Sequence, residues 1–504
     1  MAIPGKTVFL AFTLCLPSAL SGASGGTPDS WIPARWEGGP LELARRAKAN
    51  TLPADAAVRE AIANWYDAAT LSLLEGSPVN CLLVTWSAGA DAGLEQRQQR
   101  LIKAYTAEAH KRGLAVLGLV YPGADPSRTA AEAAGAGLDG LVLDGEFEAG
   151  PAFPVVIPIA RDAASGRTVK RPIVAVQGVS PSVRNLADMG IRSGPSSEPW
   201  IESNVWLVRS FRLGPAWRPV WISHQPGAGS PGDYARCVAD AAVAGGRWIV
   251  ALDDDLRARL RRNDSAALAT WRRIGALLNF AEAHADWRVF LPFGNLAIIL
   301  DAAGADPETS DEYLKLVARR QTPYRLIVRS QLSAASLAGF RAVLAAELAP
   351  PTEAERRILK DFAERGGVVV AGRSWGDPPK DEPYSEVRVG KGRVVVYKDP
   401  DPESVARDMR NLLSQEEMGV VVFNVPSVIT YASAGEGGRR LLVQLLNYSN
   451  SPAEAITIRV KGNFKTARLY VPEAASSDLV LKSEEGRVDV SIPKLALWAG
   501  VLLE

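Results

Sequence analysis

Three carboxylates follow a short apolar segment in the stretch GLVLDGEFEAG, residues 140–150. The apolar residues run from Gly140 to Leu143, and Asp144, Glu146 and Glu148 come after them. In an extended chain, residues two apart share a face and lie about 6.5–7 Å apart. Because an unpaired charge is costly to bury, we expect Asp144 and Glu146 where a buried strand reaches solvent. Two carboxyl groups there could serve as acid and as base or nucleophile.

Other polar and aromatic residues occupy the ends of other apolar segments. These residues are Trp86, Tyr121, Gln177, His224, Gln225, Asp253 and Asp254. The loop SSEPWIESNVW, residues 196–206, adds Trp200 and Glu202. Aromatic faces stack on the C–H faces of sugars, and polar groups bond to sugar hydroxyls. The set therefore predicts a carbohydrate as ligand or substrate.

Short runs rich in Val, Ile and Leu alternate with helical patterns from about residue 30 to residue 290. We expect strands at residues 81–86, 114–121, 140–145, 155–160, 172–178, 219–225 and 248–254, with a weaker one at 32–38. These runs are apolar throughout, as is typical of parallel strands buried on both faces. Amphipathic helices are expected at residues 94–113 and 230–246, each ending at glycine.

Eight such strands within about 260 residues predict a (β/α)₈ TIM barrel over residues 30–290. The strand ends would meet at the C-terminal mouth of the barrel, where barrel enzymes keep their active sites. The segment between the strand at 140–145 and the one at 155–160 contains Gly150, Pro151 and Pro154 and is too short for a helix. Either the barrel is irregular there, or the strand count is wrong by one.

Two further domains are expected after the barrel. Residues 291–415 alternate strand and helix patterns, which predicts a small α/β domain of flavodoxin or glutamine-amidotransferase type that is a candidate for forming homo-oligomers. Residues 419–504 contain short strands separated by Gly, Pro, Asn and Ser, which predicts an antiparallel β-sandwich.

The N-terminus and the composition limit the classes of partner. Lys6, the apolar residues 7–20 and small residues near Ala23 are typical of a signal peptide at residues 1–23, so we expect a secreted or periplasmic protein without an integral membrane segment after cleavage. The net charge of +1 does not suggest a nucleic-acid partner. Cys81 and Cys237 fit no metal site and are expected to be buried, although one disulfide between them stays open. We expect neither a metal nor a cofactor.

The order of signal peptide, parallel barrel, α/β domain and β-sandwich resembles the architecture of family 42 β-galactosidases. The segments LLVQLLNYSNSP (441–452) and GRVDVSIPKLALWAGVLLE (486–504) look like the closing domain of such proteins, and GKGRVVVYKD (390–399) resembles the end of their middle domain. That resemblance implies a glycoside hydrolase.

The catalytic motifs of that family are not matched. The family pairs Asn-Glu after the fourth strand with Glu after the seventh, whereas this chain has Asp144-Gly145-Glu146 and then ISHQP, residues 222–226. Other glycosidase families with barrels use an Asp after the fourth strand as nucleophile, and Asp144 matches that position. We therefore expect Asp144 as nucleophile or base and Glu202 or Glu146 as acid, with Asp253 as a further candidate partner.

Less demanding interpretations stay open beside these. Asp144 and Glu146 could merely cap a loop and bind arginines, and Asp254 or Asp255 is expected to cap the helix that begins there. His224, Trp86 and Trp200 could be structural. The rival hypothesis to an enzyme is a non-catalytic carbohydrate-binding or cell-surface protein on a degenerate barrel, and the missing acid after the seventh strand favours it.

Overall fold

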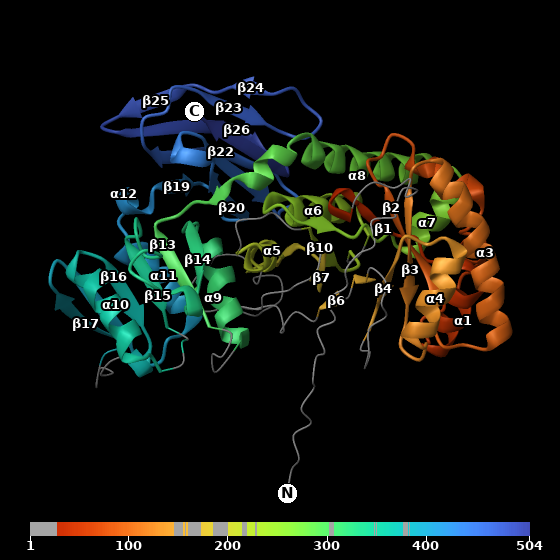
Figure 1. Ribbon diagram of the computed structural model, residues 1–504. Helices are drawn as coiled ribbons and strands as arrows, with labels where there is room; N and C mark the ends of the chain where they lie inside the picture. Colours follow the sequence, from red (N-terminus) through yellow and green to blue (C-terminus); the bar gives the residue numbers. More distant parts are fainter. Residues whose placement is uncertain are drawn as a thin grey trace, which may run out of the picture.

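A computed structural model gives the fold. It describes residues 28–145, 155–156, 158–159, 173–184, 200–213, 219–226, 229–301, 307–346, 348, 350–375, 382 and 384–504. The predicted signal peptide and Glu146 lie outside the described residues. The chain forms three regions, and in Figure 1 the first lies to the right, the second to the left and the third along the top.

The first region contains two parallel sheets. The first has the order β1-β2-β3-β4-β5, and the second has the order β11-β10-β7-β6. Their strands are β1 (Pro33–Arg35), β2 (Cys81–Ser87), β3 (Ala115–Val120), β4 (Gly140–Leu143), β5 (Val155–Val156), β6 (Pro158–Ile159), β7 (Val174–Gln177), β10 (Val220–Ser223) and β11 (Arg247–Trp248). Each of the eight segments predicted as parallel strands contains residues of these strands. The observed strands are mostly shorter than the predicted ones.

The two sheets are linked at both of their ends. Ala34 of β1 forms a parallel bridge with Val250, just after β11. On the other side, β5 pairs with β4, and β6, which follows β5 after a single residue, pairs with β7. One link is therefore a backbone bridge, and the other is the continuity of the chain from β5 to β6.

Alternate side chains of the strands enter two different hydrophobic clusters. One cluster collects residues from both sheets, namely Trp31, Cys81, Leu83, Ala115, Leu117, Leu119, Tyr121, Val142, Ile173, Ala175, Trp221 and Ile249. The intervening residues, such as Val84, Leu141 and Ile222, belong to a second cluster that includes the surrounding helices. We call these the inner and the outer face. Cys81 and Cys237 are both buried and free, so no disulfide joins them.

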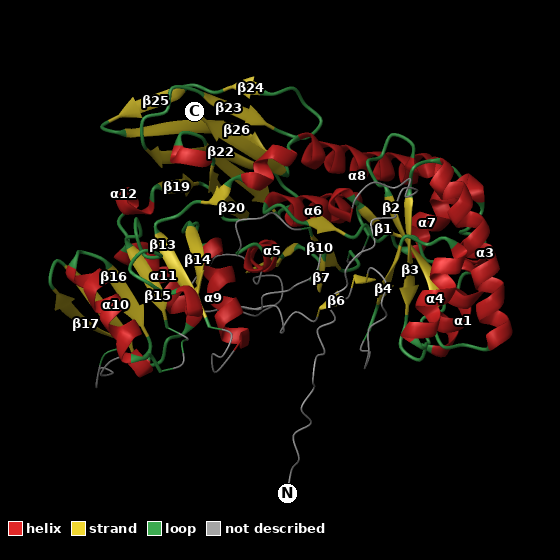
Figure 2. Ribbon diagram, in the orientation of Figure 1, coloured by secondary structure: helices red, strands yellow, loops and turns green. Residues whose placement is uncertain are grey.

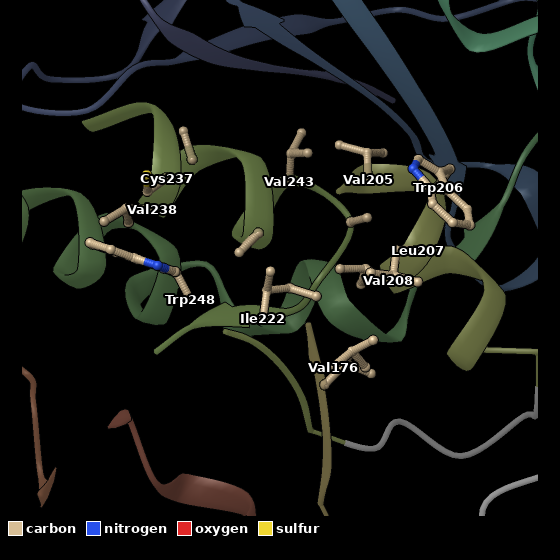
Figure 3. Close-up of a cluster of buried hydrophobic side chains, with 14 of the residues drawn as sticks. Val176, Val205, Trp206, Leu207, Val208, Ile222, Cys237, Val238, Val243 and Trp248 are labelled. Atoms are coloured by element: carbon tan, nitrogen blue, oxygen red, sulfur yellow. The ribbon is translucent and has the colours of Figure 1, made fainter. Parts of the chain in front are cut away.

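Helices cover the outer face, as Figure 2 shows. They are α1 (Gly39–Lys48), α2 (Ala56–Ala63), α3 (Ala92–Lys111), α4 (Pro126–Ala136), α5 (Val205–Phe211), α6 (Pro231–Val243), α7 (Asp254–Arg261) and α8 (Ser265–Ala283). In the close-up of Figure 3, Val176 of β7 and Ile222 of β10 point toward α5 and α6. A short antiparallel pair, β8 (Ser182–Arg184) and β9 (Trp200–Glu202), stands apart from both sheets.

The second region is one sheet with helices. Its order is β14-β13-β15-β16-β18-β17, parallel except for the edge strand β17. The strands are β13 (Leu296–Leu300), β14 (Tyr324–Val328), β15 (Ala342–Ala345), β16 (Val368–Ala371), β17 (Tyr384–Val389) and β18 (Gly392–Tyr397), and the helices are α9 (Pro307–Arg319), α10 (Glu353–Glu364), α11 (Pro402–Leu412) and α12 (Gln415–Met418).

The third region consists of two antiparallel sheets, β12-β20-β21-β27-β23-β24 and β19-β22-β26-β25, whose side chains share one buried cluster. The strands are β12 (Leu291–Pro292), β19 (Val420–Phe423), β20 (Val428–Ala434), β21 (Leu441–Asn447), β22 (Ala453–Lys461), β23 (Ala467–Tyr470), β24 (Ser477–Asp478), β25 (Leu481–Glu484), β26 (Arg487–Leu495) and β27 (Trp498–Leu503). Because β12 pairs with β20, residues 291–292 join these sheets and not the second region.

A matched pair of substitutions tests the inner cluster. Leu117→Ala removes a side chain that is buried in this cluster, whereas Leu291→Ala removes one that is 63% exposed. We expect Leu117→Ala to lower the free energy of unfolding by about 2–5 kcal/mol and Leu291→Ala to change it by less than about 0.5 kcal/mol. Urea unfolding followed by circular dichroism measures both. Equal effects would contradict the assignment of Leu117 to the core.

Candidate functional site

An arginine joins two carboxylates at the C-terminal ends of β1 and β4. Arg35, the last residue of β1, donates from Nη1 to Glu37 Oε1 at 3.1 Å and from Nη2 to Asp144 Oδ2 at 2.7 Å. Asp144 directly follows β4 and keeps its backbone hydrogen bond to Val120 of β3. By strand alternation Arg35, Glu37 and Asp144 continue the inner face, beyond its apolar cluster. We call these residues, with Tyr121 and Arg45, the Arg35 network.

Glu37 is the buried carboxylate of the Arg35 network. Its carboxylate accepts a hydrogen bond of 2.5 Å from the Tyr121 hydroxyl and lies 3.8 Å from Arg45 Nη2. Burial alone would raise the pKa of Glu37, but Arg35, Tyr121 and Arg45 outweigh it and hold this pKa well below its ordinary value. Burial and the neighbouring Glu37 raise the pKa of Tyr121. Glu37 is therefore a fixed negative charge, and Tyr121 is its neutral donor.

The start of α1 supports this arrangement from above. Glu42, which is fully buried, accepts hydrogen bonds from Arg45 at 2.7 and 2.9 Å, from Arg46 at 2.5 Å and from Thr85 of β2 at 3.2 Å. The guanidinium of Arg45 lies 4.2 Å from the centre of the Tyr121 ring, within the range of a cation–π contact. The charges at this end of β1–β4 therefore neutralise one another in a connected set.

Asp144 is the carboxylate of this network that solvent reaches. Its side chain is 26% exposed against 6% for Glu37. Among the described residues, Arg35 is the one side chain that bonds to the Asp144 carboxylate. Chemically, an oriented and partly exposed carboxylate can act as a base, a nucleophile or an acceptor for hydroxyl groups. The buried Glu37, with its lowered pKa, is unsuited to act as an acid.

Several predicted residues share the inner face with Asp144. Tyr121 is buried within the Arg35 network. Gln177 ends β7 and Gln225 follows β10, and both side chains are exposed. By alternation they continue the inward-facing positions of Ala175 and Trp221. The two glutamines therefore place exposed amide groups at the ends of β7 and β10.

Asp253 has a structural role in the fold. It is the N-cap of α7, where its Oδ1 accepts from the Leu256 backbone at 2.7 Å, and its Oδ2 accepts from the Tyr234 hydroxyl at 2.5 Å. The sequence predicts Asp254 or Asp255 as the cap, and the structure corrects this to Asp253. Both oxygens of Asp253 are engaged, which disfavours a catalytic role for it.

Trp86 and His224 face the helices and do not face the inner side. Trp86 is buried on the outer face and donates to the Thr129 carbonyl of α4 at 3.3 Å. His224 Nε2 lies 3.2 Å from Cys237 Sγ of α6, and burial lowers the pKa of His224 to about 4. Neither position presents its ring to a ligand, so the structural alternative accounts for both residues.

Trp200 and Glu202 lie together on β9. The indole Nε1 of Trp200 donates to Glu202 Oε1 at 2.8 Å, and both residues are half-buried. The Trp200 ring lies 5.3 Å from the guanidinium of Arg319 at the end of α9. This pair therefore faces the second region on at least one side. Among the described residues, no hydrogen bond or ion pair joins Trp200 or Glu202 to the Arg35 network.

The described residues contain neither a cluster of metal-ligating side chains nor a helix that could span a membrane. In that part of the chain, no group of three or more His, Cys, Asp and Glu side chains is arranged to hold a metal ion. Over the same residues, no helix is both long enough and apolar enough to cross a bilayer.

Arg35, Glu37 and Arg45 were not singled out from the sequence, although a signal was present. The segment IPARWEGG, residues 32–39, carries two charges at positions two apart, Arg35 and Glu37. Asp144 and Glu146 have the same spacing at the end of another apolar run. Arg45 had no comparable signal, because its place over Tyr121 depends on the direction in which α1 leaves β1.

No protein-family model matches the chain, and no curated protein matches it. Among solved structures, α-L-fucosidase isoenzyme 2 from Paenibacillus thiaminolyticus is similar at a TM-score of 0.54 and 12% identity, covering 86% of this chain and 95% of that chain. An exo-β-1,4-mannosidase from Opitutaceae bacterium strain TAV5 has a TM-score of 0.44 and 12% identity, with 77% and 96% covered. A GH42 β-galactosidase from G. stearothermophilus has a TM-score of 0.39 and 10% identity, with 81% and 68% covered. At this identity, the likeness to the fucosidase shows a glycosidase-like fold. It does not by itself assign an activity to this chain.

Acid should weaken the contribution of Glu37 to stability. A carboxyl group whose folded pKa lies below its unfolded pKa stabilises the fold above the unfolded value and loses this effect as the pH falls toward the folded value. At pH 7 we expect Glu37→Gln to lower the free energy of unfolding by about 3–5 kcal/mol, because Arg35 is left without its buried partner. The difference from the wild type should shrink between pH 5 and pH 3, as measured by urea unfolding at each pH.

Glu108→Gln is the matched control for this substitution. Glu108 forms an ion pair with Lys111 on the exposed face of α3, and exposed pairs contribute little to stability. We expect almost no effect of Glu108→Gln at pH 7. A Glu37→Gln variant as stable as this control would contradict the role given to Glu37.

Proposed function

We propose that the two parallel sheets form one closed barrel of eight strands, in which β5 and β6 together count as one strand. Three observations support this closure: the bridge between Ala34 and Val250, the pairing of residues 155–159 with both β4 and β7, and the single inner cluster drawn from both sheets. In such a barrel the C-terminal ends of the strands surround one mouth. Asp144, Gln177 and Gln225 would then face a common space.

We further propose the predicted division into a barrel at residues 30–290, a small α/β domain at 291–415 and a β-sandwich at 419–504. The shared buried cluster of the two antiparallel sheets supports the sandwich. The pairing of β12 with β20 supports moving residues 291–292 from the α/β domain to the sandwich. Cleavage of a signal peptide near Ala23, export, and homo-oligomers formed through the α/β domain remain part of the proposal.

The function that the geometry supports best is hydrolysis of a glycosidic bond at the mouth of this barrel. The observation that carries it is the position of Asp144, a partly exposed carboxylate at the end of β4 that Arg35 orients. The fold likeness to an α-L-fucosidase over nearly the whole length of both chains makes a sugar substrate the natural hypothesis. Gln177 and Gln225 would bond to sugar hydroxyls.

In this mechanism Asp144 is the nucleophile or the base. The second carboxyl group must protonate the leaving group, and it would lie about 5–5.5 Å from Asp144 in a retaining enzyme or about 6.5–9.5 Å in an inverting one. Glu146 and Glu202 are the candidates for the acid. Asp253 is the weaker one, because a helix cap and a tyrosine occupy its oxygens.

One observation favours the second candidate function, which is carbohydrate binding without catalysis. Of the described carboxylates in the Arg35 network, Glu37 is buried with a lowered pKa and Asp144 is paired with Arg35. Arg35 engages both of them, so neither is free of a cationic partner as a proton donor would need to be. If the acid is missing, the same mouth would retain a sugar and leave its bonds intact.

A screen with 4-nitrophenyl glycosides, including α-L-fucosides, β-galactosides and β-mannosides, tests the catalytic proposal. We expect release of nitrophenol by the wild type and a loss of about 100-fold or more in kcat/KM for Asp144→Asn. Asp255→Asn is the control, because Asp255 is an exposed carboxylate on α7, and it should leave the rate unchanged.

Calorimetric titration of the same two variants with sugars separates the two functions. Binding without hydrolysis that is weakened by Asp144→Asn, but not by Asp255→Asn, would support the binding protein over the enzyme. If no sugar is hydrolysed or bound, or if Asp144→Asn has no effect on either, both candidates fail.

A further inference from the structure

A buried carboxylate connects the third region of the molecule with the first. Asp240 of α6 is fully buried. Its Oδ1 accepts from the hydroxyl of Tyr448 at 2.5 Å and from that of Ser203 at 2.7 Å. Tyr448 directly follows β21, in the larger antiparallel sheet, and is itself buried. Burial raises the pKa of Asp240, although each of these donors works against the rise. Every donor to this carboxylate therefore matters.

The other oxygen of Asp240 holds Asn204. Asp240 Oδ2 accepts from the Asn204 backbone at 2.9 Å and from its side-chain Nδ2 at 2.8 Å. Asn204 is fully buried at the start of α5. Asp240 therefore sets the orientation of the Asn204 side-chain amide. The carbonyl and the second N–H of this side chain remain for other partners.

Asn204 uses that orientation to clasp the chain that leaves β7. Its Oδ1 accepts from the Val179 N–H at 2.8 Å, and its Nδ2 donates to the Val179 carbonyl at 2.9 Å. The two bonds imitate a pair of strand hydrogen bonds. Val179 lies two residues beyond Gln177, the exposed end of β7.

The residue between Gln177 and Val179 packs closely against β10 and Asn204. At Gly178 a Cβ atom would lie 2.4 Å from the Ile222 side chain and 2.6 Å from Asn204 Oδ1. The Gly178 N–H also bonds to the Ser223 carbonyl at 2.9 Å. The segment after β7 is thus held between β10 and Asn204, and Figure 3 shows α5 and α6 stacked over these strands.

Other contacts between α6 and the third region end at α6. Arg236 donates to Asn450 Oδ1 at 2.7 Å, and Gln444 Nε2 donates to the Val243 carbonyl at 2.7 Å. Neither contact continues to a strand end. The connection from Tyr448 differs from them because each bond leads to the next, through Asp240 and Asn204 to Val179.

We propose that Tyr448 is a positioning residue of the site: through Asp240 and Asn204 it fixes Gly178 and Val179, and with them the direction of Gln177. The antiparallel sheets would then help to set the binding geometry of the first region and not only cover α6 and α8. The inference rests on the proposed function solely where it takes Gln177 as a ligand-facing residue. The hydrogen-bonded connection itself requires no ligand.

Hydrogen–deuterium exchange on the full chain tests this connection without any sugar. In Tyr448→Phe the carboxylate of Asp240 loses a donor, and we expect the peptide covering residues 173–184 to exchange about tenfold faster at its protected amides. The peptide covering β3 should keep the exchange rate of the wild type. Asn204→Ala removes the clasp directly and should give at least the same local increase.

Asn450→Ala is the control in the same loop. It weakens the contact with Arg236 and leaves Asp240 untouched, so the peptide covering residues 173–184 should not respond. An unchanged peptide in Tyr448→Phe, or equal increases in Asn450→Ala and Tyr448→Phe, would overturn the proposal. If Tyr448→Phe does not fold, Ser203→Ala removes another donor to Asp240 and carries the same expectation. Because no ligand is involved, these outcomes do not depend on whether the protein hydrolyses or binds a sugar.

Discussion

The buried charge of Glu37 is the constraint on which the described site depends. A carboxylate below the protein surface must be paired and hydrogen-bonded, and Arg35 and Tyr121 meet this need for Glu37. Arg35 then has one edge of its guanidinium left, and Asp144 takes it. The orientation of Asp144 is therefore a consequence of neutralising Glu37. Helix α1 serves the same need, because its Arg45 lies near Glu37 and is itself paired with Glu42.

A second buried carboxylate, Asp240, plays a comparable part between regions of the chain. Four groups donate to it. Three belong to Ser203 and Asn204 in the turn before α5, and the fourth is the hydroxyl of Tyr448 after β21. Residues more than 200 positions apart, Asp240 and Tyr448, thus share one polar centre. Each carboxylate fixes a group near the end of a strand. Glu37, through Arg35, fixes Asp144 after β4, and Asp240, through Asn204, fixes Val179 after β7. In this way the two buried carboxylates specify geometry at the strand ends where we propose that a ligand binds.

Much of the fold could be predicted from apolar runs, because parallel strands that are buried on both faces consist almost entirely of apolar residues. Strands of mixed composition give a weaker pattern, for example β17 with Glu386 and Arg388, and β20 with Thr430 and Ser433. In the site, strand alternation along β4 puts Asp144 on the inner side with Val142. Applied to β2 and β10, it would have put Trp86 and His224 with the outward residues, as observed. The links that run through helix direction, such as Arg45 on Tyr121, could not be predicted from spacing.

A double-mutant cycle between Arg35 and Asp144 tests the central claim most directly, namely that Arg35 holds Asp144 at the end of β4. The variants are Arg35→Gln, Asp144→Asn and the double variant, each measured by urea unfolding at pH 7. We expect a coupling energy of about 1–3 kcal/mol, because each single substitution breaks the same ion pair. Effects that add to within about 0.5 kcal/mol would mean that the two side chains do not interact, and the account of the site would be wrong.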